Sequence, residues 1–237
     1  MANFGLTRLT VVAPYEPHWR EARSAVGAPE VLQNAKEAAT LSEAVADCTF
    51  VAGTGTRTYR KPEQPVISLP DLTEILCPKL ASGNRVALVF GPEKHGLTRD
   101  DLSWCHALIE IPTDPGQPSM NLGQAVAVIL YELSRAATNH ESNSGEVHGL
   151  PPLVQQPTEK VGHGAVEPAS TSGTLDRLAG LIEEIMAAAG YSPRAMRSAN
   201  QHDLRLLLRR LAPSSLDTRR MMGLFRRILH RLRHPPR

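Results

Sequence analysis

The chain has 237 residues, 41% of them hydrophobic and 21% charged, which is enough for one ordinary domain with a buried core and a smaller second one. The 26 basic and 24 acidic residues nearly cancel, so the net charge of +2 indicates no class of partner. Three cysteines without regular spacing exclude a disulfide framework, the N-terminus lacks a signal peptide, and the longest apolar run, residues 122–133, is too short for a bilayer, so we expect a cytoplasmic protein.

Strands and helices alternate over the first half of the chain. Residues 6–13 are rich in Val and Leu and predict a buried strand that stops at Pro14. Asp71 is expected to cap one helix, and Thr98 to cap a short one. The alternation predicts an α/β domain with a mostly parallel sheet. Further strands are expected at residues 49–52, 85–90 and 107–111, and further helices at residues 33–39, 41–46 and 71–80.

The helix that follows Ser119 is apolar on nearly every side. One stripe at helical spacing predicts packing on the sheet, and it consists of Leu122, Ala125, Val126, Ile129, Leu130 and Leu133. The other side carries Ala127, Val128 and Tyr131. Such a helix must be covered on both faces, which favours a subunit interface over the alternative of a deeply buried helix.

The second half of the chain changes in composition. Residues 138–173 are rich in Ser, Gly, Pro, His, Asn and Glu, which predicts a flexible linker. Residues 174–234 then predict a small all-α module. Its helices are expected at residues 175–189 with Gly190 as C-cap, at residues 202–211, and from Ser214 or Ser215 onward.

Three loops of unusual composition leave consecutive strands. They are Gly53-Thr54-Gly55-Thr56, Phe90 to Leu97 (FGPEKHGL), and Ile111-Pro112 through Asn121. Loops at the carboxyl ends of parallel strands meet at one edge, so they predict one site. Glycines, apolar walls and a few polar groups suit a ligand with a flat base and polar ends. There is no Walker or dinucleotide fingerprint, and no metal is expected, since Cys105-His106 lacks two further ligands.

The second and third loops, with SMNLGQA at residues 119–125, resemble two of the three signature motifs of the SpoU/TrmH superfamily of SPOUT RNA methyltransferases. The resemblance covers nearly the whole chain and implies a deep trefoil knot, bound S-adenosylmethionine and a homodimer with active sites at the subunit interface. The linker and basic tail are most similar to the members that methylate a tRNA ribose at anticodon-loop position 32, on cytidine or uridine. Ribosomal RNA stays open as the alternative substrate; neither DNA nor a membrane is expected as a partner.

The resemblance also implies roles for individual residues. Glu93, Ser119 and Asn121 correspond to its active-site residues. Two simpler roles stay open, because Glu93 could only brace its own loop and Ser119 could only cap the next helix. The cofactor contacts would be Thr54, Gly55, Thr56, Gly91, Ile111, Ser119, Met120 and Asn121.

At the first motif, this chain departs from the pattern of the superfamily. Asn3-Phe4-Gly5-Leu6, which ends that motif, stands at the N-terminus, so the preceding strand and the arginine credited with activating the hydroxyl are missing. Residues 1–137 therefore form an N-terminally incomplete methyltransferase domain. Either the true start lies upstream or the chain is an inactive RNA-binding relic; the intact second and third motifs favour the first explanation. Arg8 and Arg57 lie outside the matching motif and receive no catalytic role.

Arginines crowd the last helices, where Asp217 is nearly the only acid. Arginine binds phosphates through two hydrogen bonds and stacks on bases, so this composition predicts RNA binding. A merely solvated charged face would intersperse lysine and glutamate. The arginines are Arg205, Arg209, Arg210, Arg219, Arg220, Arg226, Arg227, Arg231, Arg233 and Arg237.

Overall fold

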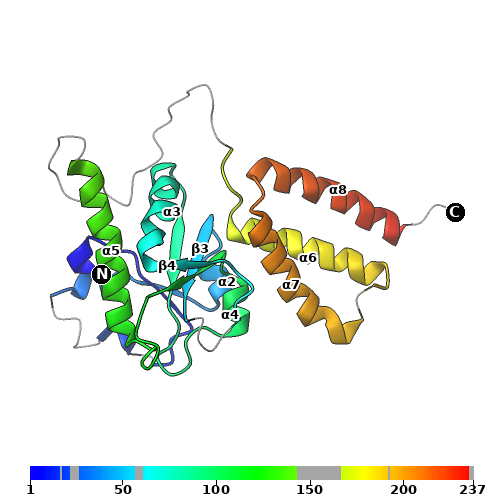
Figure 1. The fold of residues 1–237 in the computed structure, drawn as a ribbon. Coiled ribbons are helices and arrows are strands. Elements are labelled where there is room, and N and C mark those ends of the chain that lie inside the picture. The colour runs from blue at the N-terminus through cyan, green and yellow to red at the C-terminus, as the bar shows by residue number, and fades with distance from the viewer. Residues whose placement is uncertain (17, 22–26, 57–60, 143–166, 192, 235–237) are drawn as a thin grey trace.

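The computed structural model describes the chain except residues 17, 22–26, 57–60, 143–166, 192 and 235–237. It contains a parallel four-stranded sheet in the order β4-β6-β3-β5, which confirms the predicted α/β class; Figure 1 labels β3 and β4. β4 was not predicted, because its three residues run directly into a helix. The strands are β3 (Phe50–Thr54), β4 (Val66–Ser68), β5 (Val86–Val89) and β6 (Ala107–Glu110), so the predictions at 49–52, 85–90 and 107–111 are confirmed with small shifts.

Helices cover both faces of this sheet. α3 (Leu69–Ala81) and α5 (Leu122–Ser142) share one core with Ala52 and Ile109. On the other face, α2 (Leu41–Ala44) and α4 (Arg99–Ser103) lie over Val51 and Leu108. Neighbouring residues of one strand thus enter different cores, as the two-residue period of a strand requires.

The N-terminal part corrects one prediction. The helix expected at residues 33–39 is wrong: α1 (Pro29–Gln33) ends there, and β2 (Lys36–Ala38) follows. β2 pairs in parallel with β1 (Thr10–Val12), which is shorter than the predicted strand at 6–13, and the two form a separate sheet. Hydrogen bonds between distant segments decide the outcome, since a three-residue segment has no periodicity of its own. Two 3-10 turns, η1 (Ala2–Phe4) and η2 (Trp19–Glu21), complete this part.

Of the two helix N-caps predicted in the first half of the chain, one is wrong and one is confirmed. Asp71 does not cap α3; Ser68 occupies the N-cap position, Pro70 follows in the first turn, and Asp71 lies inside the helix. Proline fits the first turn because its fixed φ is helical and no hydrogen bond is needed there. Thr98 does cap α4, in a capping box with Asp101.

α5 is amphipathic in the free chain. Ile129 and Leu130 are buried against the sheet, whereas Val128 is 37% and Tyr131 57% exposed. The alternative of a helix buried on all sides is therefore wrong for this chain. The predicted subunit interface on the exposed side stays a prediction, as does the trefoil knot.

A helical module follows, as predicted. α6 (Ser172–Ala188) packs against both α7 (Arg197–Leu211) and α8 (Ser215–Arg233), with a short turn η3 (Arg194–Met196) before α7. Gly190 has a left-handed backbone after α6, and the Ser214 hydroxyl caps α8. Part of the predicted linker at 138–173 is helical, since α5 runs to Ser142 and α6 starts at Ser172; residues 143–166 lie outside the described chain.

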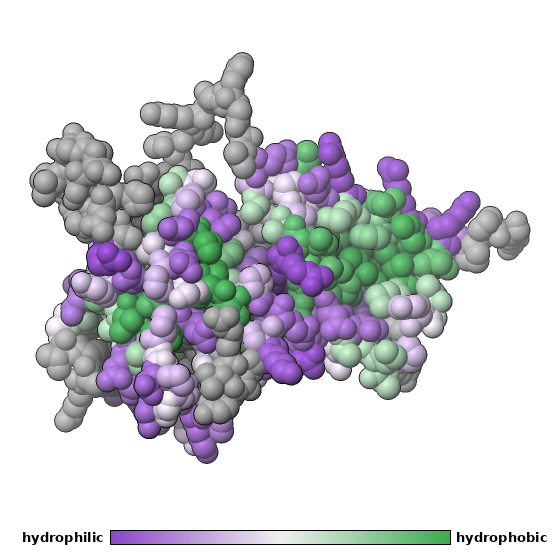
Figure 2. All heavy atoms as spheres, in the orientation of Figure 1, coloured by the Kyte–Doolittle hydropathy of each residue, from purple (hydrophilic) through white to green (hydrophobic). Residues whose placement is uncertain are grey.

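The surface of this module is partly apolar. Leu224, Ile228 and Leu232 of α8 are between 38% and 57% exposed, and Figure 2 shows apolar atoms gathered over the module. None of the helices in the described ranges is long and apolar enough to cross a membrane.

Candidate functional site

The three predicted loops start side by side at the carboxyl edge of the sheet. The Thr54 hydroxyl at the end of β3 donates to the Val89 carbonyl at the end of β5, at 3.2 Å. On the other side of β3, the Gly55 N–H donates to the Ile109 carbonyl of β6, at 3.1 Å. The structure thus brings together the segments that the sequence predicted to form one site.

The loop after β5 folds back on itself. The Gly96 N–H donates to the Pro92 carbonyl at 2.8 Å, and Gly96 has a left-handed φ of 63°. A Cβ at Gly91 would lie 2.2 Å from the backbone of Gly96 and Leu97, so no side chain fits there. Gly91 is required by the close approach of the two ends of this loop.

Asn121 joins the second and third loops. Its Nδ2 donates to Oε1 of Glu93 at 3.0 Å, while its Oδ1 accepts from the N–H of Gly123 at 2.9 Å and of Gln124 at 3.4 Å. Asn121, and not Ser119, therefore caps α5. Glu93 braces more than its own loop, because its partner Asn121 lies on the other loop.

The remaining predicted residues differ in exposure. Ser119 is exposed and Met120 is 36% exposed, whereas Ile111 is half-buried and packs on the main core. Thr56 is half-buried at the end of the first loop. The edge therefore offers apolar side chains, backbone groups of glycine-rich loops and one carboxylate, a combination that can hold a base with polar ends.

Cys105 and His106 are buried residues of the protein core. His106 Nδ1 accepts a hydrogen bond from the Val51 N–H at 3.1 Å, and burial lowers the pKa of its imidazole to about 3. Burial likewise raises the pKa of the Cys105 thiol to about 12. The described part of the chain contains no cluster of three or more His, Cys, Asp or Glu side chains suited to a metal.

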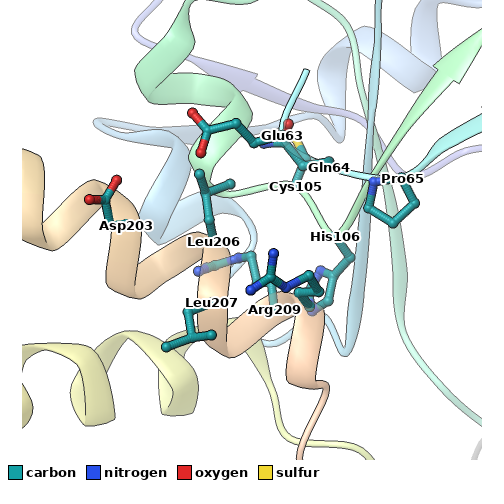
Figure 3. A pocket seen from close by; sticks show the side chains of 10 residues that line it. Glu63, Gln64, Pro65, Cys105, His106, Asp203, Leu206, Leu207 and Arg209 are labelled. Atoms are coloured by element: carbon teal, nitrogen blue, oxygen red, sulfur yellow. The ribbon is translucent and has the colours of Figure 1, made fainter. Parts of the chain in front are cut away.

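Two cavities lie away from Asn121, at the seam between the sheet domain and α7. One of about 290 Å³ is bordered by His106 and by Arg209 (Figure 3). The other, about 390 Å³, borders the loop after β5 through His95 and Leu97 and reaches His202 of α7.

Two arginines assigned to RNA binding are placed differently by the structure. Arg209 is only 3% exposed, and the guanidinium of Arg205 lies 4.1 Å from the ring centre of Trp104. Both side chains make contacts within the protein and are not free to bind RNA. No local sequence pattern around Trp104 predicts these contacts. The exposed tail arginines are Arg210, Arg219, Arg220, Arg226, Arg227, Arg231 and Arg233, while Arg237 lies outside the described residues.

Comparisons with known proteins agree with this geometry. The profile of the SpoU rRNA Methylase family matches residues 1–131. The tRNA (cytidine/uridine-2′-O-)-methyltransferase TrmJ of Salmonella choleraesuis (strain SC-B67) is 32% identical over 228 residues, which are 94% of this chain and 86% of the relative. The TrmJ of Yersinia enterocolitica is 29% identical over 238 residues, covering 100% of this chain and 86% of its own length.

Solved structures give the same result. The crystal structure of TrmJ from Z. mobilis ZM4 superposes with a TM-score of 0.75 at 28% identity, covering 96% of this chain and 89% of that one. A putative methylase family protein from Neisseria gonorrhoeae superposes with a TM-score of 0.51 at 32% identity, over 67% of this chain and 78% of its own. The chain belongs to the SpoU rRNA methylase family.

Proposed function

We propose that this protein transfers a methyl group from S-adenosylmethionine to a ribose 2′-hydroxyl of tRNA. The hydrogen bond between Asn121 and Glu93 carries the proposal, because it joins two family motifs at the sheet edge where the first loop, at Thr54 and Gly55, also begins. The activity of the TrmJ relatives, 2′-O-methylation of cytidine or uridine in tRNA, supports the choice of tRNA as substrate. We assign position 32 of the anticodon loop as the target.

The described residues suit S-adenosylmethionine. Ile111 and Met120 offer apolar surface for an adenine, and the first loop reaches the same edge at Thr54 and Gly55. We propose Thr54, Gly55, Thr56, Gly91, Ile111, Ser119, Met120 and Asn121 as the residues that hold it. When bound, the cofactor would supply an electrophilic methyl carbon, whose bond to sulfur breaks as its bond to the ribose oxygen forms.

The side chains would act on the ribose. A hydroxyl is a poor nucleophile at neutral pH, so its proton must leave as the new C–O bond forms. Glu93 is an exposed carboxylate held by Asn121, and we assign it the role of receiving that proton. Ser119 is exposed two residues from Asn121 and is assigned to orient the ribose.

RNA binding is assigned to the helical module. We propose that residues 1–137 form the methyltransferase domain, that residues 138–173 connect it, and that residues 174–234 hold RNA. All six arginines of α8 are exposed: Arg220, Arg227 and Arg231 lie on the face opposite Phe225 and the buried Leu229, and Arg219, Arg226 and Arg233 follow one flank of the helix. The one described acid that pairs closely with them from another helix is Glu184, 2.8 Å from Arg233. This face suits a phosphate backbone.

A homodimer is part of the proposal. Val128 and Tyr131 form exposed apolar surface on α5, the same helix that begins next to Asn121. Covering this surface with a second copy would place the partner next to the site. A cytoplasmic location stays a prediction.

Ribosomal RNA is a second candidate substrate, favoured by the description of the matching family. Parallel assays with bulk tRNA and with ribosomal RNA separate the two. Transfer to ribosomal RNA alone would overturn the assignment of tRNA.

Calorimetry with S-adenosylmethionine and S-adenosylhomocysteine tests the site, using Glu93→Gln as the informative variant. We expect binding to both compounds, and we expect Glu93→Gln to keep that affinity while methyl transfer falls by at least about tenfold. Lys94→Gln, an exposed neighbour, serves as the control and should retain transfer. Absence of any cofactor binding by the unmodified chain would contradict the proposed function.

A further inference from the structure

The helical module meets the sheet domain through a specific set of contacts, made by the first turn of α6 and by α7. The first two N–H groups of a helix have no acceptor within the helix. Here the Ser172 N–H donates to the Cys48 carbonyl at 2.7 Å, and the Gly173 N–H donates to the Ala46 carbonyl at 2.9 Å. Both acceptors belong to the turn between α2 and β3.

Gly173 packs closely against this turn, where a side chain would have to displace the backbone of Ala46. A Cβ there would lie 3.0 Å from the Ala46 carbonyl oxygen, whereas a Cβ at Gly180 of the same helix would meet nothing within 4 Å. The contact between the module and the sheet domain therefore favours a small residue at 173, and a branched side chain such as valine should push the two apart.

Arg209 forms the second attachment. Its Nε donates to the Trp104 carbonyl at 2.9 Å, its Nη2 to the Ser172 hydroxyl at 2.7 Å, and its Nη1 to the Arg205 carbonyl at 3.3 Å. The cation thus ties α7 to the start of α6 and to the end of α4. Burial lowers the pKa of Arg209 to about 10, yet the group stays charged at neutral pH.

Arg205 completes the contact from the neighbouring turn. It lies over the Trp104 ring, donates to Asp100 Oδ1 at 3.1 Å, and lies 3.6 Å from Asp176 Oδ1. Trp104 is itself 7% exposed and is covered by both guanidinium groups, with Arg209 at 5.1 Å. The close-up in Figure 3 shows Arg209 of α7 turned toward His106 at this seam.

We infer that Gly173 and Arg209 are positioning residues: they fix the module on the sheet domain so that RNA held by α8 reaches the loops in one orientation. This rests on the proposed function for the RNA. A module joined only through residues 143–166 would bind RNA equally well but would present the ribose in many orientations. Fixed docking therefore raises turnover without raising affinity for tRNA.

Amide hydrogen exchange resolved to single residues measures whether the module is docked on the sheet domain, and it needs neither RNA nor cofactor. The N–H groups of Ser172 and Gly173 have acceptors only across the seam, so their protection reports this contact. We expect exchange at both to be slower than in an unstructured peptide by at least about tenfold. Gly173→Val and Arg209→Ala should each abolish this protection, while Gly180→Val and Arg210→Ala, an exposed neighbour, should keep it.

The same variants separate positioning from binding. In methyl-transfer assays we expect Gly173→Val and Arg209→Ala to lower kcat about tenfold, with KM for tRNA and affinity for S-adenosylhomocysteine unchanged within about twofold. Arg210→Ala should instead raise KM and keep kcat. Unchanged cofactor affinity shows that the sheet domain is folded, and Gly173→Val keeps the buried arginine intact.

Each result decides the inference. Unprotected amides at 172 and 173 in the unmodified chain would overturn the docking, and lost protection with unchanged kcat would overturn the positioning role. If the unmodified chain binds cofactor but transfers no methyl group to any RNA, the proposed function fails and the positioning role with it, whereas the exchange data still decide the docking.

Discussion

Asn121 is the residue at which the candidate site and the fold depend on each other. One side-chain amide caps α5 through its oxygen and holds Glu93 through its nitrogen. A substitution can therefore separate the two roles, since aspartate retains the capping oxygen and loses the donor.

Asn121→Ala is expected to lower the free energy of unfolding by about 1 kcal/mol, because it removes the cap of α5. Asn121→Asp should keep most of that stability but place a second carboxylate against Glu93. We expect methyl transfer to fall by at least about tenfold in both variants. Urea titrations and initial rates give the two quantities, and an Asn121→Asp protein as active as the unmodified chain would contradict the role of this contact.

His106 makes stability depend on pH. Its pKa falls from an ordinary value of 6.5 to about 3 in the folded protein, so between these values the unfolded chain takes up a proton and the folded chain does not. The neutral imidazole is therefore fully compatible with the fold above about pH 6.5, and stability is lost as the pH drops toward 3, by up to about 1.4 kcal/mol per pH unit.

His106→Asn tests this dependence, since an asparagine oxygen can replace the acceptor for the Val51 N–H without titrating. We expect urea titrations from pH 7 to pH 4 to show a shallower loss for His106→Asn than for the unmodified chain. His230→Asn, at an exposed position of α8, should leave the pH profile unchanged. Parallel profiles for all three proteins would contradict the buried neutral histidine.

At the scale of single residues, the sequence identifies which side chains belong to the site better than it predicts which side chains they contact. The motifs identified Asn121 and Glu93 as site residues, but nothing in the sequence predicted the hydrogen bond between them. Trp104 and Arg209 are 105 residues apart in the chain, so no local spacing could reveal their contact.

At the scale of elements, α5 combines a buried stripe with an exposed apolar side. Val128 and Tyr131 are both on the exposed side, where single charges would be tolerated by a monomer but not by an apolar interface. We therefore expect the paired variant Val128→Glu with Tyr131→Glu to sediment as a monomer, while the unmodified chain sediments as a dimer. Glu74→Lys, an exposed change on α3, controls for charge, and a monomeric unmodified chain would contradict the interface.

Length decides which elements the sequence predicts correctly. α5 and α8 carry several turns of apolar spacing, and both were predicted. β2 and β4 have three residues each, and their state is set by pairing with β1 and with β6. Pairing of this kind is tertiary information, so β2 was assigned to a helix and β4 was missed.

At the scale of the whole molecule, the arrangement divides the tail arginines by task. Arg205 and Arg209 attach the module, whereas those on α8 face solvent. Composition alone identified a basic tail, but it could not separate these two groups because both have the same local sequence character.

The exposed group should control the salt dependence of RNA binding. We expect Arg219, Arg226 and Arg227, replaced together by alanine, to weaken tRNA affinity and to reduce the slope of log affinity against log salt by about 2. Arg20→Ala, an exposed change in the N-terminal part, should alter neither quantity. Fluorescence anisotropy across a salt series measures both, and an unchanged slope would assign RNA binding to another surface.

The most direct test of the central claim is mass-spectrometric mapping of tRNA after incubation with this protein and isotopically labelled S-adenosylmethionine. We expect one labelled methyl group per substrate tRNA, on the 2′-oxygen of the pyrimidine at position 32. A label on a base, or no label from a protein that binds the cofactor and tRNA, would contradict the account.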